Sequence, residues 1–313
     1  MPDLSAALAQ LKEKGLLRQR RTLSGPQGAY VEMDGKRYLA FCSNDYLGLA
    51  NDPRIASVVC QAASRYGVGS GASAMISGHG FLHEKLEQAL AQFVGCERAL
   101  HFSTGFLANT GVVQALAGKG DAVFSDEFNH ASLIDGVRLS KAQVEIYSHG
   151  DMTHLEFALA SSTAPRKLVV SDAVFSMDGD FAPVPKLVEL CERYDAWLLL
   201  DDAHGFGVTG KQGRGTLSHF GVRSKNVIYM GTLGKAAGVA GAFVAASADV
   251  VEWLLQTARS YVFTTAAPPM LAAGVLASLQ LIEAEENRRV RLQHLITALK
   301  EGLKDLPWRL LPS

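Results

Sequence analysis

Short apolar runs alternate with helix-periodic stretches between about residue 54 and residue 247. The runs typical of strands are ALHFS (99–103), DAVFSD (121–126), VEIYSH (144–149), KLVVSDAVFS (167–176), AWLLLDDAH (196–204), NVIYM (226–230) and GAFVAAS (241–247). Because the centres of these runs are almost wholly apolar, we expect the strands to be buried on both faces. The pattern predicts an α/β fold with a doubly wound, mainly parallel sheet covered by helices on both sides.

Three regions are predicted around this sheet. Residues 1–45 form an N-terminal segment, with a helix over about 3–21 and a hairpin over 29–41 that turns at an Asp-Gly pair. Residues 46–270 form the large domain, and residues 271–313 begin a small C-terminal α/β domain that we expect to be incomplete in this chain. Ligands of such sheets bind beyond the carboxyl ends of the strands, so the residues after each run are the candidates for function.

The composition is that of an ordinary folded protein. The chain has 313 residues, 48% of them hydrophobic and 19% charged, and a formal net charge of -1. Because Lys and Arg are scattered, we expect no nucleic-acid partner. No run of about 18 apolar residues occurs and the N-terminus lacks a signal-peptide core, so we expect no membrane association. The four cysteines form no CxxC pair, which is typical of a reduced, cytoplasmic protein.

Several polar segments at strand ends are ambiguous by themselves. The segment Ser103–Phe106 opens a helix whose free N–H groups suit a phosphate, although Ser and Thr are also ordinary helix caps. His130 and Ser176 follow two other runs, and neither residue is informative alone.

The run AWLLLDDAH ends in two acids and a histidine. Asp201 and Asp202 must point to opposite faces of the sheet, so only one of them can face a given pocket. A metal site would explain these residues and His204, but no HExxH motif or second acid-histidine cluster accompanies them. His79 and His83 have HxxxH spacing, yet they lie in a glycine-rich segment rather than on a clear helix. We therefore predict no metal.

Lys235 lies in GTLGKAAGVA (231–240), among small and apolar residues. A solvated loop lysine is the usual interpretation, and the segment is not a P-loop because Ala236 replaces the Ser or Thr of that motif. A poorly hydrated lysine, in contrast, has a lowered pKa and becomes an amine nucleophile. Lys235, the acid at 201, the histidines and a phosphate-binding helix start together match the needs of pyridoxal phosphate.

The chain resembles the α-oxoamine synthases, pyridoxal-phosphate enzymes of the aspartate-aminotransferase fold (fold type I). The resemblance runs from about residue 17 to the end and rests on SNDYLGLA (43–50), GSGASAMISGHGFLHEKLE (69–87), FSTGFLANTG (102–111), DEFNHASLIDG (126–136), VFSMDGD (174–180), DDAHGFGVTG (201–210), GTLGKAAGVAGAF (231–243) and YVFTTAAPP (261–269). It implies that pyridoxal 5'-phosphate is bound covalently to one lysine, Lys235.

The resemblance also implies a role for each matching residue. The implied catalytic residues are Lys235, which moves the Cα proton, Asp201 at the ring nitrogen, His130 on the ring face and His204 at the phenolate oxygen. The implied cofactor-binding set adds Gly105, Phe106 and Thr232 at the phosphate, Ser176 at the phenolate oxygen, and Thr264 and Thr265 at the phosphate of the partner subunit. The residues implied near the substrate are Arg18, Asn44 and His130. Asp172 stands where many relatives carry Glu.

The implied activity is the decarboxylative condensation of an amino acid with an acyl thioester. SNDYLGL and SGHGFLHEKLE are most similar to members that join L-alanine to pimeloyl-CoA, or to the acyl-carrier-protein thioester, in biotin biosynthesis. These members imply a homodimer with shared active sites, and they run on by roughly 70 residues, a segment that carries an arginine for the substrate carboxylate. Three alternatives stay open: a member that uses glycine with acetyl-CoA, an aminotransferase of the same fold, and a catalytically inactive binding protein.

Overall fold

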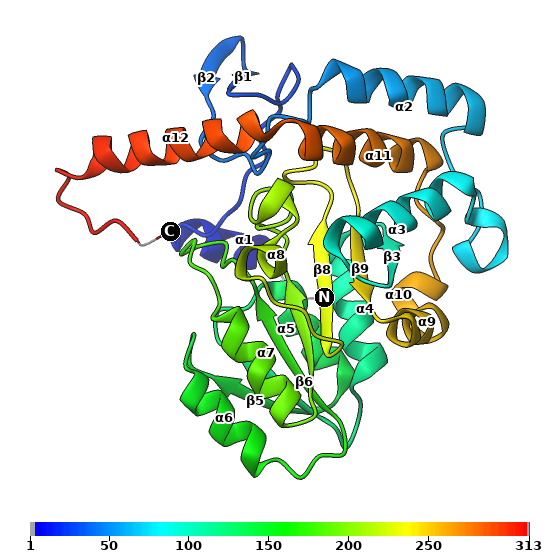
Figure 1. The fold of residues 1–313 in the computed structure, drawn as a ribbon. Helices are drawn as coiled ribbons and strands as arrows, with labels where there is room; N and C mark the ends of the chain where they lie inside the picture. The colour runs from blue at the N-terminus through cyan, green and yellow to red at the C-terminus, as the bar shows by residue number, and fades with distance from the viewer. Residues whose placement is uncertain (1–3, 312) are drawn as a thin grey trace. The chain divides into compact units, whose positions relative to one another are not determined.

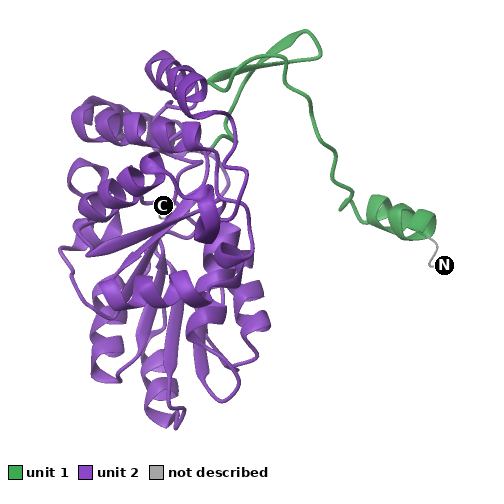
Figure 2. Cartoon of the chain, turned by 90° about the vertical axis from the view of Figure 1, so that its right-hand side faces the viewer, with its two compact units in different colours: residues 1–43 green, residues 44–313 purple. Residues whose placement is uncertain are grey.

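The computed structural model describes residues 4–311 and 313, and the chain divides into two compact units, 1–43 and 44–313 (Figure 2). The described part of the first unit contains helix α1 (Leu4–Glu13) and strands β1 (Tyr30–Met33) and β2 (Lys36–Leu39). The helix predicted over 3–21 is thus shorter than expected. It ends before Gly15, whose positive φ of 66° is incompatible with a continuing right-handed helix.

The predicted hairpin of the first unit is confirmed. Strands β1 and β2 pair antiparallel, with Met33 opposite Lys36. The two residues between them, Asp34 and Gly35, both have positive φ, at 52° and 70°. This is the backbone that an Asp-Gly type I′ turn requires, and its twist matches that of the flanking strands.

A seven-stranded sheet forms the centre of the second unit, in the order β3-β9-β8-β7-β6-β4-β5 (Figure 1). The strands are β3 (Arg98–Phe102), β4 (Ala122–Asp126), β5 (Gln143–Tyr147), β6 (Lys167–Asp172), β7 (Trp197–Asp201), β8 (Val227–Thr232) and β9 (Ala242–Ala246). Only β9 runs against its neighbours β3 and β8, and the other pairs are parallel. The prediction of a mainly parallel sheet is therefore confirmed.

Helices cover both faces of this sheet. The described helices of the second unit are α2 (Pro53–Tyr66), α3 (Phe81–Val94), α4 (Gly105–Leu116), α5 (Ala131–Ser140), α6 (Met152–Ser161), α7 (Val184–Arg193), α8 (Thr216–Phe220), α9 (Ala248–Thr257), α10 (Arg259–Val262), α11 (Pro269–Ala284) and α12 (Glu286–Leu303), with short helical turns at Ala74–Gly78 and Lys211–Gly213. None of the described helices is both long and apolar enough to span a membrane.

Two hydrophobic cores lie on opposite faces of the sheet. One core joins Leu198 and Leu200 of β7 to helices α3, α6, α7 and α11. The other joins Leu199 of the same strand to helices α4, α5 and α9. This alternation along one strand is the double winding that the apolar runs predicted.

Two of the predicted domain boundaries can be compared with the structure. The first unit ends at residue 43, two residues before the predicted boundary. The predicted start of a small domain at residue 271 falls inside α11, which belongs to the second unit together with α12. A separate domain beginning at this position stays a prediction.

Candidate functional site

The carboxyl ends of neighbouring strands bring polar side chains together at one edge of the sheet. Asp172 ends β6 and Asp201 ends β7, and the two residues are paired in the parallel register. Thr232 ends β8, and Lys235 follows it after a short turn. These are the strand ends at which the sequence predicted function.

The two adjacent acids divide between the faces of the sheet, as strand alternation predicts. Asp201 Oδ2 accepts a hydrogen bond from Asn109 Nδ2 of α4 at 2.7 Å. Asp202 lies on the opposite face, where it accepts hydrogen bonds from the Thr216 N–H and the Tyr229 hydroxyl, each at 2.7 Å. Asp202 therefore stabilises the fold, and Asp201 faces the candidate site.

Asp201 is a buried carboxylate that needs a cation. It is 3% exposed, and within the described part of the chain it forms no ion pair. Burial raises the pKa of Asp201, and burial together with the nearby Asp201 raises the pKa of Asp172 to about 8. An uncompensated charge in such a place is costly, so a cationic ligand group beside Asp201 would be strongly held.

Lys235, His204 and Tyr46 form a hydrogen-bonded chain. Lys235 Nζ lies 2.9 Å from His204 Nε2, and His204 Nδ1 lies 2.7 Å from Tyr46 Oη. Burial lowers the pKa of Lys235, although Asp201 and Asp172 oppose the shift. Burial and the charge of Lys235 lower the pKa of His204 to about 4. His204 is therefore neutral near pH 7, and Lys235 is more readily available as a free amine than a solvated lysine.

His130 is oriented by the first turn of α5. Its backbone N–H donates to Asp172 Oδ2 at 2.8 Å, and its Nδ1 lies 2.7 Å from Ser132 Oγ. Asn109 Nδ2 donates to the same Ser132 Oγ at 2.9 Å, which leaves the hydroxyl proton for His130 Nδ1. The Ser132 N–H also points to Nδ1, at 3.3 Å, so Nδ1 is an acceptor and Nε2 is the ring nitrogen left to donate.

The start of α4 lies against the end of β8. Thr104 caps the helix by accepting the Leu107 N–H at 3.2 Å. A Cβ on Gly105 would lie 2.8 Å from Thr232 Cγ2, so only glycine permits this approach. The first N–H groups of the helix, at Gly105 and Phe106, thereby come next to Thr232, an arrangement suited to a phosphate.

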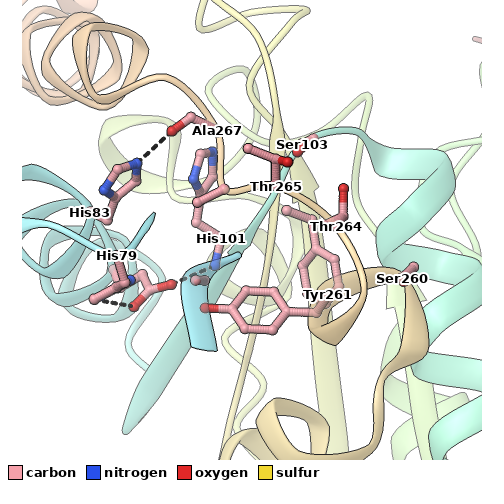
Figure 3. Close-up of a pocket in the computed structure, with 13 residues that line it drawn as sticks. His79, His83, His101, Ser103, Ser260, Tyr261, Thr264, Thr265 and Ala267 are labelled. Atoms are coloured by element: carbon pink, nitrogen blue, oxygen red, sulfur yellow. Dashed lines mark hydrogen bonds and ion pairs between the residues drawn. The ribbon is translucent and has the colours of Figure 1, made fainter. Parts of the chain in front are cut away.

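The other residues predicted from the sequence lie at the margin of this cluster or outside it. Asn44 is exposed, and its Oδ1 contacts the cluster at 3.4 Å from Tyr46 Oη. Ser176 is exposed in a turn after β6. Thr264 and Thr265 line a small cavity together with Ser103 (Figure 3). Arg18 is exposed in the first unit. The roles given to these residues stay predictions.

Sequence reasoning missed three residues of the site: Tyr46, Asn109 and Ser132. Asn109 is fully buried in a helix that is otherwise mostly apolar, and a lone amide in such a helix was a signal that could have found it. Tyr46 and Ser132 carry no comparable signal, because their contacts join segments that are distant in sequence or depend on the side chain of the helix cap.

The chain is similar to known proteins over nearly its whole length. Residues 36–313 match the family described as aminotransferase class I and II. The chain is 59% identical to the 8-amino-7-oxononanoate synthase of Herminiimonas arsenicoxydans, covering 99% of this chain and 81% of that protein. It is 58% identical to the 8-amino-7-oxononanoate synthase of Nitrosospira multiformis, covering 96% of this chain and 76% of the relative.

The fold is also similar to that of solved enzyme structures. A serine palmitoyltransferase from S. paucimobilis, solved with bound PLP and myriocin, has a TM-score of 0.92 at 30% identity and covers 98% of this chain and 81% of its own. The 8-amino-7-oxononanoate synthase from Francisella tularensis has a TM-score of 0.76 at 33% identity and covers 87% of this chain and 77% of its own.

Proposed function

Since this chain belongs to the class I and II aminotransferases and, within them, to the 8-amino-7-oxononanoate synthases, we propose that it makes 8-amino-7-oxononanoate. The reaction is the pyridoxal-phosphate-dependent condensation of L-alanine with pimeloyl-CoA or pimeloyl-acyl carrier protein, in biotin biosynthesis. It releases carbon dioxide and the free thiol. The observation that carries the proposal is the contact between the half-buried amine of Lys235 and His204 at 2.9 Å, beside a buried acid.

The residues at the site fit pyridoxal phosphate. Asp201 forms no ion pair with any residue that the structure describes, and a protonated ring nitrogen would supply a cation. Lys235 has the lowered pKa that attachment to an aldehyde requires. The glycine-permitted approach of α4 to Thr232 offers N–H groups to a phosphate. When bound, the cofactor withdraws electrons from the bonds at Cα of an amino acid.

Lys235 is the residue that we propose to hold the cofactor covalently and to move the substrate proton. Burial lowers the pKa of its Nζ, so a larger fraction of the amine is unprotonated near pH 7 and able to accept a proton from the substrate. His204 Nε2 lies within hydrogen-bond distance of this amine and fixes its direction. Because His204 is neutral near pH 7, it orients the amine without adding charge.

We propose that Asp201 and His130 position the ring of the cofactor, Asp201 at its nitrogen and His130 on one face. Asp201 is fixed by Asn109 and by the Ala203 N–H at 2.9 Å, so its carboxylate is already oriented before a ligand arrives. His130 presents the Nε2 proton because Ser132 occupies Nδ1. We propose that its ring covers one face of the cofactor.

A homodimer with shared active sites completes this proposal. Thr264 and Thr265 lie in a segment that the family resemblance directs to the phosphate of the partner subunit. Arg18 and Asn44 are proposed to lie near the carboxylate of the substrate, and Ser176 is proposed to donate to the phenolate oxygen.

A thioester panel tests the proposed function. Purified protein with pyridoxal phosphate is supplied with L-alanine and pimeloyl-CoA, pimeloyl-acyl carrier protein or acetyl-CoA, and separately with glycine and the same thioesters. We expect free thiol and carbon dioxide in equal amounts with L-alanine and a pimeloyl thioester. Preferred turnover of glycine with acetyl-CoA would assign the other condensation. Amino-group transfer to a keto acid without carbon dioxide would assign an aminotransferase.

A further inference from the structure

The HxxxH pair of the sequence, His79 and His83, lies at a second cluster of polar side chains, which shares no residue with the site at Lys235. His83 lies on α3, and both of its ring nitrogens are occupied. Its Nδ1 accepts the Gly80 N–H at 3.0 Å, and its Nε2 donates to the carbonyl of Ala267 at 2.7 Å (Figure 3). His83 therefore supports the fold, and only His79 of the pair is free to bind a ligand.

His79 shares a small space with two carboxylates. Its Nε2 lies 3.2 Å from Glu84 Oε2 and 3.8 Å from Glu87 Oε2. All three ligand atoms lie within 4.8 Å of one another. A Zn²⁺ ion with ligands at about 2.0–2.2 Å holds them roughly 3.4 Å apart in tetrahedral geometry, so the observed spacing needs little adjustment.

The second oxygen of each carboxylate is held by another donor. Glu87 Oε1 accepts the backbone N–H of His101 at 2.8 Å, and Glu84 Oε1 accepts Gln88 Nε2 at 2.6 Å. The oxygens turned toward His79 are thus the ones left for a cation. Outer hydrogen bonds of this kind orient the carboxylates of protein metal sites.

Burial distinguishes one of the carboxylates from an ordinary surface acid. The Glu87 side chain is 13% exposed, so its charge is poorly solvated. His101, 7% exposed, lines the same cavity as His79 and Glu87, and its Nε2 has no hydrogen-bond partner among the described residues. The cavity measures about 20 Å³, enough for one water or ion.

From this arrangement we propose a divalent transition-metal site, with Zn²⁺ as the best match, formed by His79, Glu84 and Glu87. One imidazole and two carboxylates are ligands of this class of ion, and a water in the cavity completes four-coordination. The ion would join the turn at His79 to the first turns of α3. The same cavity is lined by Thr264 and Thr265, so the metal would stabilise the segment proposed to reach the partner subunit.

Zinc binding to the holoenzyme tests this site. Protein freed of metal with a chelator is titrated with Zn²⁺ alone in a calorimeter, and bound zinc is counted after gel filtration. We expect one Zn²⁺ per chain and a rise in melting temperature. His79→Ala and Glu84→Gln, which change partly exposed side chains, should each weaken binding about tenfold or more.

Matched variants at exposed positions control for zinc bound elsewhere. His294→Ala and Glu192→Gln should bind Zn²⁺ as the unaltered protein does, because neither residue lies in the cluster. The proposal is overturned if the unaltered protein takes up no zinc, or if His79→Ala and Glu84→Gln bind it as tightly as the two controls.

Discussion

Position 235 shows how burial changes the chemistry of one side chain. Lysine is ordinarily a hydrated cation, but here the surrounding small residues remove water and lower the pKa of the amine. Its hydrogen-bond partner among the described residues is His204, whose own pKa is lowered to about 4. The sequence predicted this environment from the neighbours of Lys235, because Gly234, Ala236 and Ala237 leave no polar group to replace the lost water.

Lys235→Ala should abolish covalent attachment of the cofactor and reduce turnover by about 10²–10⁴-fold, since the variant loses the group that moves the proton. The measurement is borohydride reduction of the holoenzyme followed by peptide mapping, with turnover assayed in parallel. Lys225→Ala, which changes an exposed lysine ten residues earlier, is the matched control. A pyridoxyl label on another peptide of the unaltered protein would refute the assignment.

Tyr46→Phe should reduce turnover by roughly fivefold with little change in KM, because it removes one hydrogen bond worth about 1 kcal/mol that orients His204. The pH profile of kcat should shift as well, since Tyr46 contacts the imidazole directly. Tyr66→Phe removes the hydroxyl of a surface tyrosine on α2 and should leave both measurements unchanged. Identical kinetics and pH profiles for Tyr46→Phe and the native enzyme would show that Tyr46 does not position His204.

At the scale of elements, strand ends could be predicted and side-chain partners could not. The apolar runs located every strand of the sheet, because a strand buried on both faces leaves a continuous local pattern. The expected burial was wrong for β5, an edge strand in which only Tyr147 is buried. The opposite directions of Asp201 and Asp202 followed from strand geometry alone. In contrast, Tyr46 and His204 are 158 residues apart, and only the folded chain brings them together. Helix α1 ended early because one glycine outweighed the amphipathic pattern.

The approach of α4 to β8 carries a prediction of its own. Gly105→Ala places a Cβ 2.8 Å from Thr232 Cγ2, and relieving this contact should cost about 1–3 kcal/mol and displace the first N–H groups of the helix. We therefore expect weaker binding of pyridoxal phosphate, about tenfold, measured by titrating the cofactor-free protein. Gly302→Ala in α12 meets no atom within 4 Å and should bind the cofactor normally. Unchanged affinity in Gly105→Ala would mean that this helix start does not bind the phosphate.

At the scale of the whole molecule, the candidate site is built by one chain except for the predicted contribution of Thr264 and Thr265. These residues line a cavity with Ser103 rather than contacting Lys235. A symmetric dimer would explain the difference, because each subunit would then complete the site of the other. In a shared site, a defect in one subunit impairs the site that holds the lysine of the other subunit.

Two variants that are each impaired at low cofactor concentration should partly restore activity when they are mixed. Lys235→Ala removes the amine, and Thr265→Val removes a hydroxyl that we propose binds the phosphate of the partner's site, so each homodimer is impaired at low cofactor concentration. A hybrid of the two has one site with both defects and one site with neither. Random re-association makes half of the dimers hybrids, so about a quarter of the native activity should return. If Thr265 instead acted within its own chain, each site of the hybrid would keep one defect and mixing would restore nothing. Sedimentation of the mixture under assay conditions would verify that dimers are present, which separates a failure to assemble from a failure to share sites.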